Sequence, residues 1–463
     1  MDTPVSTFIK LMRGPHRFLL ESVEKGTQRG RYSILGDTAL YQILVKNGHL
    51  RIIDDQDQVT EYNDGDPFLY LKTFYQRFIH PTLNHIPFIN GGLFGYLGYD
   101  CVRYIEKLPD QSRDDTRLAD IHLFVPQRIV VFDNLLNTIS LIVFVKPAQS
   151  SKSEYAAAVR MLQNMQKCIL AASLFKTEPP VSAKKISVTS NVSKAQFQDL
   201  VVKAKEYIKR GDVFQVVLSQ RLRVTSQARP FDIYRGLRVV NPSPYMFYME
   251  MGRTSLLGSS PETLVKLDQG NVKVKPIAGT CKRGETEQQD RELIEALLRD
   301  PKERAEHTML VDLGRNDVGR ICKYGSVRVE DLMSIEKYSH VIHIVSSVEG
   351  KLNENMDSID VFKACFPAGT VSGAPKVRAM EIIDHLEPNR RSIYAGAVGY
   401  FSFNGDMDVC IAIRTIYIHN GNIYLQAGAG IVADSVPERE YRETYNKAMG
   451  LLKAVEYAQG GLV

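Results

Sequence analysis

Two stretches of the chain carry a pair of glutamates on a predicted helix. The pairs are Glu303 with Glu306 in PKERAEH, and Glu440 with Glu443 in PEREYRETYNK. A spacing of three residues places both carboxylates of a pair on one face of a helix. Two such faces brought together would bind Mg²⁺, which takes one or two protein carboxylates together with water and substrate oxygens. Two solvated helix faces are the alternative, and a di-iron site is disfavoured because neither pair includes a histidine.

Two glycine-rich stretches suggest sites for an anion. Residues 365–376, CFPAGTVSGAPK, precede a helical pattern, and the first N–H groups of a helix attract anions. This stretch lacks the Walker spacing of a phosphate-binding loop. Residues 426–432, QAGAGIV, end a strand and would present further N–H groups to a ligand. We therefore expect a carboxylate rather than a phosphate, although a capped turn and a tight strand-to-loop turn would give the same patterns.

Two basic side chains lie within apolar strand patterns. Arg414, in IAIRTIYI, would bind a carboxylate with its planar guanidinium, or else lie as a charge at the edge of a sheet. His343, in VIHIVSSV, is in a setting where a histidine is more often a buried core residue than a catalyst. Together with the glutamates, Arg414 predicts a small substrate with more than one carboxylate, one held by a metal ion and another by arginine.

The elements that must position these residues fall into two predicted regions. Residues 1–175 form an N-terminal α+β region, in which Asn47-Gly48 between two apolar arms predicts a hairpin. Residues 176–191 are rich in proline, serine and lysine and are predicted to be a linker. Residues 192–463 open with a capping box that begins at Ser193. Because strands and helices alternate without a regular βαβ period, the predicted fold class is α+β.

Bulk composition narrows the class of protein further. The 463 residues carry 58 basic and 53 acidic side chains, and the net charge of +5 is too small and too scattered for a nucleic-acid surface. The six cysteines include no C-x-x-C pair, which argues against a zinc site and for a reducing compartment. No apolar run has the length of a membrane span or the form of a signal peptide. We expect a cytoplasmic protein that binds neither membrane nor nucleic acid.

Several motifs, in order and spacing, resemble those of the chorismate-binding enzymes. They are PIAGT (276–280), EHTMLVDLGRND (306–317), YSHVIHIVSS (338–347), FPAGTVSGAPK (366–376), IAIRT (411–415) and GAGIVADSVPEREYRETYNKA (428–448). The resemblance covers roughly residues 190–458 in full. It implies a large mixed or antiparallel β-sandwich flanked by helices, and a reaction that converts chorismate to anthranilate, aminodeoxychorismate, isochorismate or salicylate.

Within this family, two positions favour the large subunits (component I) of anthranilate synthases. Ala278 stands where aminodeoxychorismate synthases carry a nucleophilic lysine, and Gln215 stands where the water-adding enzymes carry a lysine base. The resemblance implies that ammonia adds to the ring, the ring hydroxyl leaves, and pyruvate is eliminated to give anthranilate in the first step of tryptophan biosynthesis. Component I of aminodeoxychorismate synthase, in the folate pathway, is the alternative. Cys281 and Lys282 depart from the arginine and proline that are usual in the family.

The resemblance also implies roles for single residues. Glu262 would be the general acid for the departing hydroxyl, and His343 and Thr370 would lie against the ring. Gln215 belongs to the same catalytic set. Mg²⁺ on Glu306 and Glu443, with Glu303 and Glu440 nearby, would hold the ring carboxylate. The implied substrate-binding residues are Gly279, Thr280, Tyr394, Arg414, Gly428, Ala429, Gly430 and Lys447.

Residues from both predicted regions resemble the tryptophan-feedback site of anthranilate synthases. The set comprises Leu20, Glu21, Ser22, Ser33, Pro242, Ser243, Pro244, Tyr245 and Met246. The hydroxyls of Ser22 and Ser33 would bind the amino-acid head group of the inhibitor L-tryptophan, and Leu20 and Met246 would contact its indole. The chain lacks the G-x-C-x-G nucleophile motif of a glutaminase. The resemblance therefore implies a partner, a glutamine amidotransferase subunit (component II), which supplies ammonia.

Overall fold

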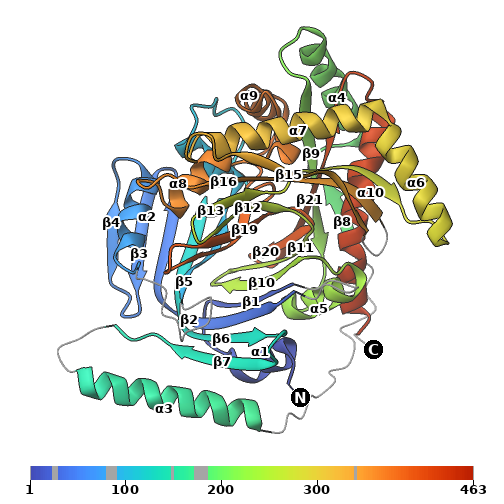
Figure 1. The fold of residues 1–463 in the computed structure, drawn as a ribbon. Coiled ribbons are helices and arrows are strands. Elements are labelled where there is room, and N and C mark those ends of the chain that lie inside the picture. Colours follow the sequence, from blue (N-terminus) through green and yellow to red (C-terminus); the bar gives the residue numbers. More distant parts are fainter. Residues whose placement is uncertain are drawn as a thin grey trace.

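Antiparallel β-structure forms the centre of the molecule, and helices lie around it (Figure 1). The computed structural model describes residues 2–22, 30–79, 91–146, 151–171, 186–337 and 341–461. Within these ranges, 21 strands join one hydrogen-bonded network, and the strands pair in antiparallel fashion. The predicted α+β class with a large antiparallel sheet is confirmed.

The first region contributes seven strands, three α-helices and a 3₁₀ helix among its described residues. In chain order they are α1 Pro4–Leu11, β1 Arg17–Glu21, β2 Tyr32–Lys46, β3 His49–Asp54, β4 Val59–Tyr62, α2 Pro67–Gln76, β5 Gly92–Leu97, η1 Tyr99–Tyr104, β6 Ile121–Asp133, β7 Thr138–Val143 and α3 Ser151–Leu170. The predicted hairpin is confirmed, because Asn47 and Gly48 connect β2 to β3 with φ values of 51° and 82°. Both positive values are those of the turn that matches the twist of two paired strands.

The second region contains the remaining elements. In chain order they are β8 Ser187–Ser190, α4 Lys194–Lys209, β9 Gln215–Thr225, α5 Pro230–Val240, β10 Tyr245–Met251, β11 Thr254–Ser260, β12 Thr263–Asp268, β13 Asn271–Val274, β14 Ile277–Lys282, α6 Glu287–Arg299, α7 Pro301–Gly319, β15 Arg328–Lys337, β16 Val341–Lys351, α8 Ser358–Cys365, η2 Gly369–Val371, β17 Gly373–Ala374, α9 Lys376–Leu386, β18 Ala397–Ser402, β19 Met407–Ile411, β20 Thr415–His419, β21 Asn422–Ile431 and α10 Pro437–Gln459. The predicted capping box of α4 is confirmed, since Ser193 Oγ accepts from Gln196 N at 3.2 Å while Gln196 Oε1 accepts from Ser193 N at 2.8 Å.

Strands from the two predicted regions share one sheet network. Strand β1 lies between β2 of its own region and β10 of the second, and β5 of the first region pairs with β18 of the second. Of the predicted linker, residues 176–185 lie outside the described residues, whereas Ser187–Ser190 form β8 and pair with β9. The boundary predicted from composition therefore does not separate two independent sheets.

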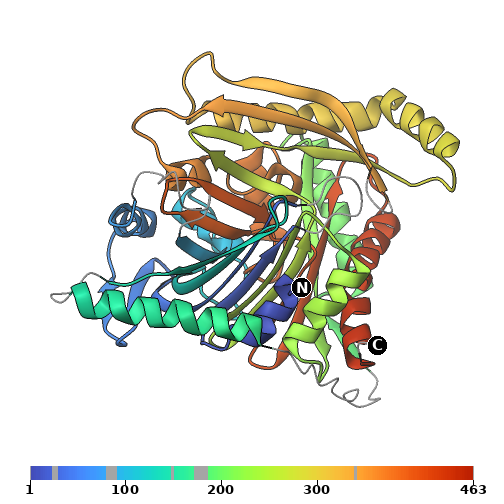
Figure 2. The ribbon, with the colours of Figure 1, turned by 60° about the horizontal axis from the view of Figure 1, so that its bottom comes forward.

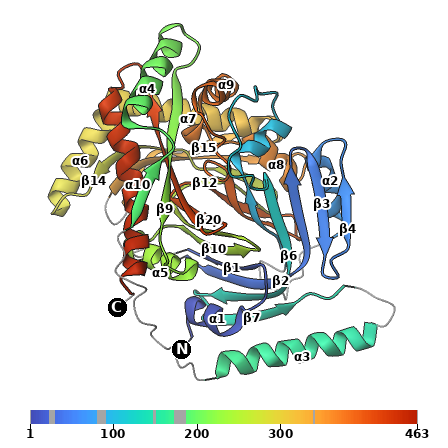
Figure 3. The same ribbon diagram turned by 180° about the vertical axis from the view of Figure 1, so that it is seen from behind.

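Two helices, α7 and α10, matter most for the placement of the site. Helix α7 packs against β14 and β16, while α10 packs against α4, α5 and β21 (Figure 3). The C-terminal half of α10 buries an apolar stripe that includes Leu451, Leu452 and Val455, which leaves its N-terminal half to carry the glutamates. Helices α6 and α7 lie on the side of the molecule opposite α3 (Figures 1 and 2). Among the described residues, no helix combines the length and apolarity needed to cross a bilayer.

Candidate active site

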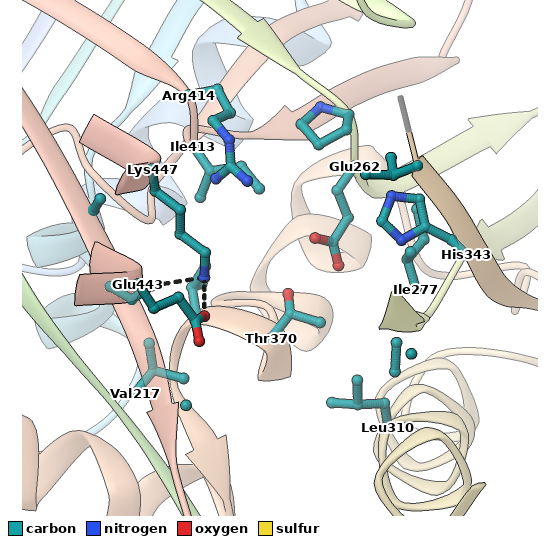
Figure 4. Close-up of a pocket in the computed structure, with 18 of the residues that line it drawn as sticks. Val217, Glu262, Ile277, Leu310, His343, Thr370, Ile413, Arg414, Glu443 and Lys447 are labelled. Carbon is teal, nitrogen blue, oxygen red and sulfur yellow. Dashed lines mark hydrogen bonds and ion pairs between the residues drawn. The ribbon is translucent and has the colours of Figure 1, made fainter. Parts of the chain in front are cut away.

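A cavity of about 1280 Å³ lies among α7, α10 and the strands of the central sheet. Most of the residues singled out from the sequence line it: Gln215, Glu262, Gly279, Glu303, Glu306, His343, Thr370, Tyr394, Arg414, Gly428, Gly430, Glu440, Glu443 and Lys447. Figure 4 shows Glu262, Thr370, Arg414 and Glu443 pointing toward one shared space. The fold thus brings together side chains that are more than 200 residues apart in the sequence.

Glu262 lies in the link between β11 and β12, and its backbone is fixed because its carbonyl accepts from Ile411 N at 3.0 Å. Its side chain is 9% exposed. Burial raises the pKa of Glu262 to about 7, and the nearby Thr370, Arg414 and Lys447 oppose this rise only in part. A carboxyl group with this pKa is partly protonated near neutral pH, which suits a general acid.

Arg414 lies in the bend between β19 and β20, with a φ of 51°, and its side chain lines the cavity. Among the described residues, its guanidinium has no hydrogen bond or ion pair. Burial lowers its pKa, because a charged group loses hydration there. A buried guanidinium without a partner in the protein is stabilised when it binds an anion, and its parallel N–H groups match the two oxygens of a carboxylate. The alternative of a solvated charge at a sheet edge is wrong.

Tyr394 borders the same part of the cavity as Arg414. Burial raises the pKa of Tyr394 to about 12, so its hydroxyl stays neutral and can donate a hydrogen bond to a carboxylate. The backbone N–H of Gly428 interacts with the Tyr394 oxygen. Together, Arg414 and Tyr394 form one half of a site for an acid group.

The four glutamates predicted on two helix faces all reach the cavity. Burial, strengthened by the neighbouring Glu306, raises the pKa of Glu303 on α7. Burial and the neighbouring Glu443 raise the pKa of Glu440 on α10, partly offset by Ser435. All four carboxylates border the same cavity, and the Glu443 side chain is 49% exposed at its margin, so metal binding by these faces stays a prediction.

Two of these carboxylates are held by neighbouring side chains. Gln215 Nε2 donates to Glu306 Oε1 at 3.0 Å. Lys447 Nζ donates to Glu443 Oε1 at 2.6 Å and to the carbonyl of Gly428 at 3.0 Å. Gln215 and Lys447 therefore orient Glu306 and Glu443, and do not face the cavity as free groups.

The donor set fits Mg²⁺ in one particular form. Carboxylate oxygens are the ligands that Mg²⁺ prefers. Burial, and to a smaller extent a neighbouring glutamate, raise the pKa values of Glu303 and Glu440, so a divalent cation would stabilise their charged forms. Within the described ranges, no three acidic, histidine or cysteine side chains are close enough to form a cage around an ion. The residues thus fit an ion that takes one or two protein carboxylates and completes its shell with water and substrate oxygens.

The glycines of QAGAGIV are needed for packing within the site, and the presentation of their N–H groups to a ligand stays a prediction. A Cβ on Gly428 would lie 2.7 Å from Tyr394 Oη, and a Cβ on Gly430 would lie 2.6 Å from Gln215 Nε2. The glycines therefore leave room for two side chains of the site, in a strand whose backbone pairs with β9. Ala429 does not reach the cavity, because its side chain packs into an apolar cluster with residues of α4 and α9.

The start of α9 lies largely outside the cavity, so the anion site predicted there has no support from the cavity lining and stays a prediction. Lys376 there forms a largely buried ion pair with Asp317 at 2.7 Å, and of the residues 365–376 only Thr370 and Val371 line the cavity. Gly373 is required by the sheet, since a Cβ there would lie 2.2 Å from the backbone oxygen of Gln215. Within the glycine-rich stretch, Thr370 lines the cavity. Its hydroxyl has no hydrogen-bond partner among the described residues.

His343, in β16, lines the cavity rather than the core. Burial lowers its pKa, and an interaction with the backbone of Gly279 opposes this change in part. A neutral imidazole in the same cavity wall as Glu262 can accept or relay a proton (Figure 4). Thr280 pairs with His343 in the β14–β16 ladder, but its side chain lies outside the described part of the structure.

The residues assigned to a tryptophan site divide between the two faces of one sheet. Glu21 pairs directly with Ser33 in β2 and with Met246 in β10, so these three side chains share a face. On that face all three are buried, and the Glu21 carboxylate accepts from the Tyr234 hydroxyl at 2.5 Å. Leu20 is the preceding residue and lies on the opposite face. The expectation that Leu20 and Met246 contact one indole is therefore wrong.

The other face of this sheet is less completely filled. Leu20 and Tyr245 are both half-buried there and pack against a cluster that includes Tyr400. The Tyr245 hydroxyl bonds to Asp408 and to Thr263, each at 2.9 Å. Ser22 follows β1 and is half-buried. Pro242, Ser243 and Pro244, the remaining members of the set, line the large cavity itself.

Sequence reasoning missed several basic groups in the cavity wall. Lys275, Lys302 and Lys337 contribute to it, as does Lys282, which was noted only as a departure from the family. Lys275 is paired with Glu336 at 2.6 Å. Nothing in their spacing marks these lysines, because most lysines on strands and helix ends are solvated. Together with Arg414 and Lys447, these lysines make the cavity wall rich in basic side chains, which suits an acidic substrate.

Comparison with known proteins identifies the family. A family model described as chorismate binding enzyme matches residues 16–453. The chain belongs to the chorismate-binding enzyme family. Among its relatives, the anthranilate synthase component 1 proteins of Acetivibrio thermocellus and Aquifex aeolicus are each 47% identical to it, over 99% of this chain and 94% and 93% of their own lengths.

Solved structures of chorismate-binding enzymes share the fold. Anthranilate synthase component I of Streptococcus pneumoniae is 37% identical, with a TM-score of 0.81 and coverage of 97% of both chains. The menaquinone-specific isochorismate synthase of Escherichia coli has a TM-score of 0.74 at 19% identity, covering 98% of this chain and 91% of its own, which shows the common fold alone. The family assignment made from the motifs is confirmed, and the match extends well into the N-terminal region.

Proposed function

We propose that this chain is the large subunit of an anthranilate synthase, which converts chorismate and ammonia to anthranilate and pyruvate. The observation that carries the proposal is 47% identity, over 99% of the chain, to proteins named anthranilate synthase component 1. The cavity wall agrees with this choice among related reactions. Ala278 offers no amine for a covalent intermediate, and the amide of Gln215 is bonded to Glu306 rather than serving as a base.

In the first chemical step, ammonia adds to the ring carbon between the carboxylate-bearing and enolpyruvyl-bearing carbons, and the ring hydroxyl leaves from another carbon as the ring double bonds shift. Glu262 donates a proton to the departing hydroxyl, which leaves as water, and the new C–N ammonium group loses one proton to become an amine. The raised pKa of about 7 keeps part of the Glu262 population protonated for this purpose. The Thr370 hydroxyl, beside Glu262 in Figure 4, is free to bond either the acid or the substrate.

The second step releases pyruvate and makes the ring aromatic. A ring proton is lost, the bond to the enolpyruvyl oxygen breaks, and the enolpyruvyl group leaves as pyruvate. His343, which is neutral because burial lowers its pKa, lies in the wall as the base for this elimination. Arg414 and Tyr394 hold the enolpyruvyl carboxylate, since they are the guanidinium and neutral hydroxyl that lie together in the cavity.

The ring carboxylate is assigned to the opposite side of the cavity. Glu306 and Glu443, with Glu303 and Glu440 nearby, would hold Mg²⁺ there, and the ion would neutralise and orient the carboxylate. Gln215 and Lys447 keep the two inner glutamates in place through bonds of 3.0 and 2.6 Å. Magnesium dependence, and with it the classification as a magnesium-dependent lyase, is part of this proposal.

A partner and an inhibitor complete the proposed function. A glutamine amidotransferase subunit (component II) supplies ammonia, in keeping with the name component 1 of the relatives. L-Tryptophan inhibits by binding on the sheet face that carries Leu20 and Tyr245, where the side chains are only half-buried. The cytoplasm is the proposed location, because all six cysteines are free thiols, as in proteins of reducing compartments.

The proposal is tested with the purified chain, chorismate, Mg²⁺ and a nitrogen source. With ammonium at mildly alkaline pH, we expect the fluorescence of anthranilate to appear. With glutamine instead, fluorescence should appear only after a glutaminase subunit is added. Fluorescence from glutamine with this chain alone would contradict the proposed division of labour, and its absence with ammonium would contradict the proposed function itself.

A further inference from the structure

A fully buried ion pair lies directly behind the cavity wall, at the end of α9. The side chains of Arg391 and Glu387 are 1% and 4% exposed. Nε of Arg391 donates to Glu387 Oε2 at 2.9 Å, and Nη2 donates to Glu387 Oε1 at 2.7 Å, which is the bidentate geometry of a strong pair. Neither residue lines the cavity, so neither contacts a substrate bound there.

The remaining donors of Arg391 reach two separate parts of the wall. Nη1 donates to the carbonyl of Val371, the residue after Thr370, at 2.7 Å. Nη2 also donates to the carbonyl of Val217, in β9, at 2.6 Å. The guanidinium carbon lies 5.7 Å from the ring centroid of Tyr394, within range of a cation–π contact. One side chain is therefore bonded to, or stacked on, three segments that carry site residues.

Glu387 extends the same network along β9 and on to β21. Its Oε1 accepts from Ser219 N at 2.8 Å and from Ser219 Oγ at 2.9 Å. Gln426 Nε2, from the cavity-lining strand β21, donates to Ser219 Oγ at 2.9 Å. The pair thus links η2, β9, β21 and the segment with Tyr394 through one set of buried polar groups.

Fold stability alone is a weak reason for such a pair. Removing two charges from water costs several kcal/mol per ion, and an apolar replacement of the same size is often as stable. An apolar pair makes no directional hydrogen bonds. A planar guanidinium can donate at the same time to a carboxylate and to two backbone carbonyls, and so fixes their relative positions. The geometry is therefore matched to the placement of segments rather than to their burial.

We propose that Arg391 and Glu387 are positioning residues of the active site, which hold Thr370 beside Glu262 and hold Tyr394 beside Arg414. Any effect of this pair on turnover rests on the proposed function. The placement of Thr370 beside Glu262 is independent of that function and can be measured on the protein without substrate. The test therefore measures the titration of the Glu262 carboxyl directly.

The variant Arg391→Lys keeps the positive charge but cannot donate in all these directions. Arg128→Lys is the matched control, because Arg128 also forms a half-buried bidentate pair, with Asp37, and does not line the cavity. Infrared difference spectra, with Glu262→Gln to identify the band, give the titration midpoint of the Glu262 carboxyl in each folded protein. The nearby Thr370 hydroxyl favours the ionised form, so displacing Thr370 raises this midpoint.

We expect Arg391→Lys to raise the Glu262 midpoint by at least about half a pH unit, while Arg128→Lys leaves it unchanged. The basic limb of the kcat–pH profile should move by the same amount, with kcat lower by about 10²-fold, as misplaced catalytic groups cause. If Arg391→Lys does not fold, Glu387→Gln, which keeps the shape of the side chain, should shift the midpoint in the same direction.

Equal midpoints in the wild-type protein and a folded Arg391 variant would overturn the positioning role, as would an equal shift in the Arg128 control. If the wild-type protein makes no anthranilate, the proposed function fails. The infrared comparison would still decide whether the pair positions Thr370.

Discussion

Replacing Glu262 by Gln tests the role of a buried acid in the cavity whose pKa is near neutrality. Burial raises its pKa to about 7, so roughly half of the molecules carry the proton at pH 7 and about a tenth carry it at pH 8. If the proton must be present for the ring hydroxyl to leave, kcat/KM should fall about tenfold per pH unit above 7, when the concentration of unprotonated ammonia is held constant.

The amide of Glu262→Gln cannot donate this proton. General acid catalysis typically contributes 10²–10⁴-fold, so we expect a loss of at least about 10²-fold in kcat, or roughly 2.7 kcal/mol of transition-state stabilisation. Chorismate binding, followed by calorimetry, should be retained, because Arg414 and the glutamates are untouched. The reasoning is refuted if the basic limb is flat to pH 9 at constant ammonia, or if the amide variant keeps more than a tenth of wild-type kcat.

Other consequences concern the metal, acid stability and the inhibitor. Glu306→Gln or Glu443→Gln should lower turnover by at least about 10³-fold, EDTA should act in the same way and reversibly, and turnover that persists in EDTA would exclude a metal role. Burial lowers the pKa of His122 to about 3 from 6.5; the unfolded chain therefore takes up the proton first, and the free energy of unfolding should fall by up to about 1.4 kcal/mol per pH unit from pH 6.5 toward 3. Denaturant titrations should show a shallower fall in His122→Leu, and equal slopes would contradict this. Leu20→Ala should relieve inhibition by tryptophan and Ser33→Ala should not; the reverse result in inhibition assays would place the inhibitor on the other sheet face.

Features that depend on near neighbours in the chain could be predicted from the sequence. The Asn47-Gly48 turn, the capping box at Ser193 and the two glutamate faces each arise within a few residues, and the structure contains all of them. Their physics is local, since a turn needs positive φ values and a helix face needs a spacing of three. The sequence motifs also predicted the family and most of the residues that line the cavity.

Features that depend on strand register could not be predicted in the same way. Leu20 and Met246 fall on opposite faces because β1 pairs with β10 in a register that places Glu21 beside Met246. Gly373 serves the pairing of β17 with β9, more than 150 residues earlier in the chain, rather than a ligand. A shift of one residue in either ladder would reverse these assignments, and nothing in the local pattern sets the register.

The buried Arg391–Glu387 pair could not be predicted from the sequence either. Its partners Val371, Val217 and Ser219 lie up to 174 residues away and use backbone groups, which leave no mark on side-chain patterns. Glu387 and Arg391 lie beyond the end of α9, on either side of Pro388 and Asn389, where charged residues are usually solvated, and only the structure shows both of them buried.

The ratio of pyruvate to anthranilate tests the central claim most directly. The wild-type chain is incubated with chorismate, ammonium and Mg²⁺, anthranilate is measured by fluorescence, pyruvate is measured by a coupled assay, and the ring products are separated by mass. We predict equal amounts of pyruvate and anthranilate, because elimination follows amination in the same cavity. Accumulation of 4-amino-4-deoxychorismate without release of pyruvate would contradict the account and favour aminodeoxychorismate synthase.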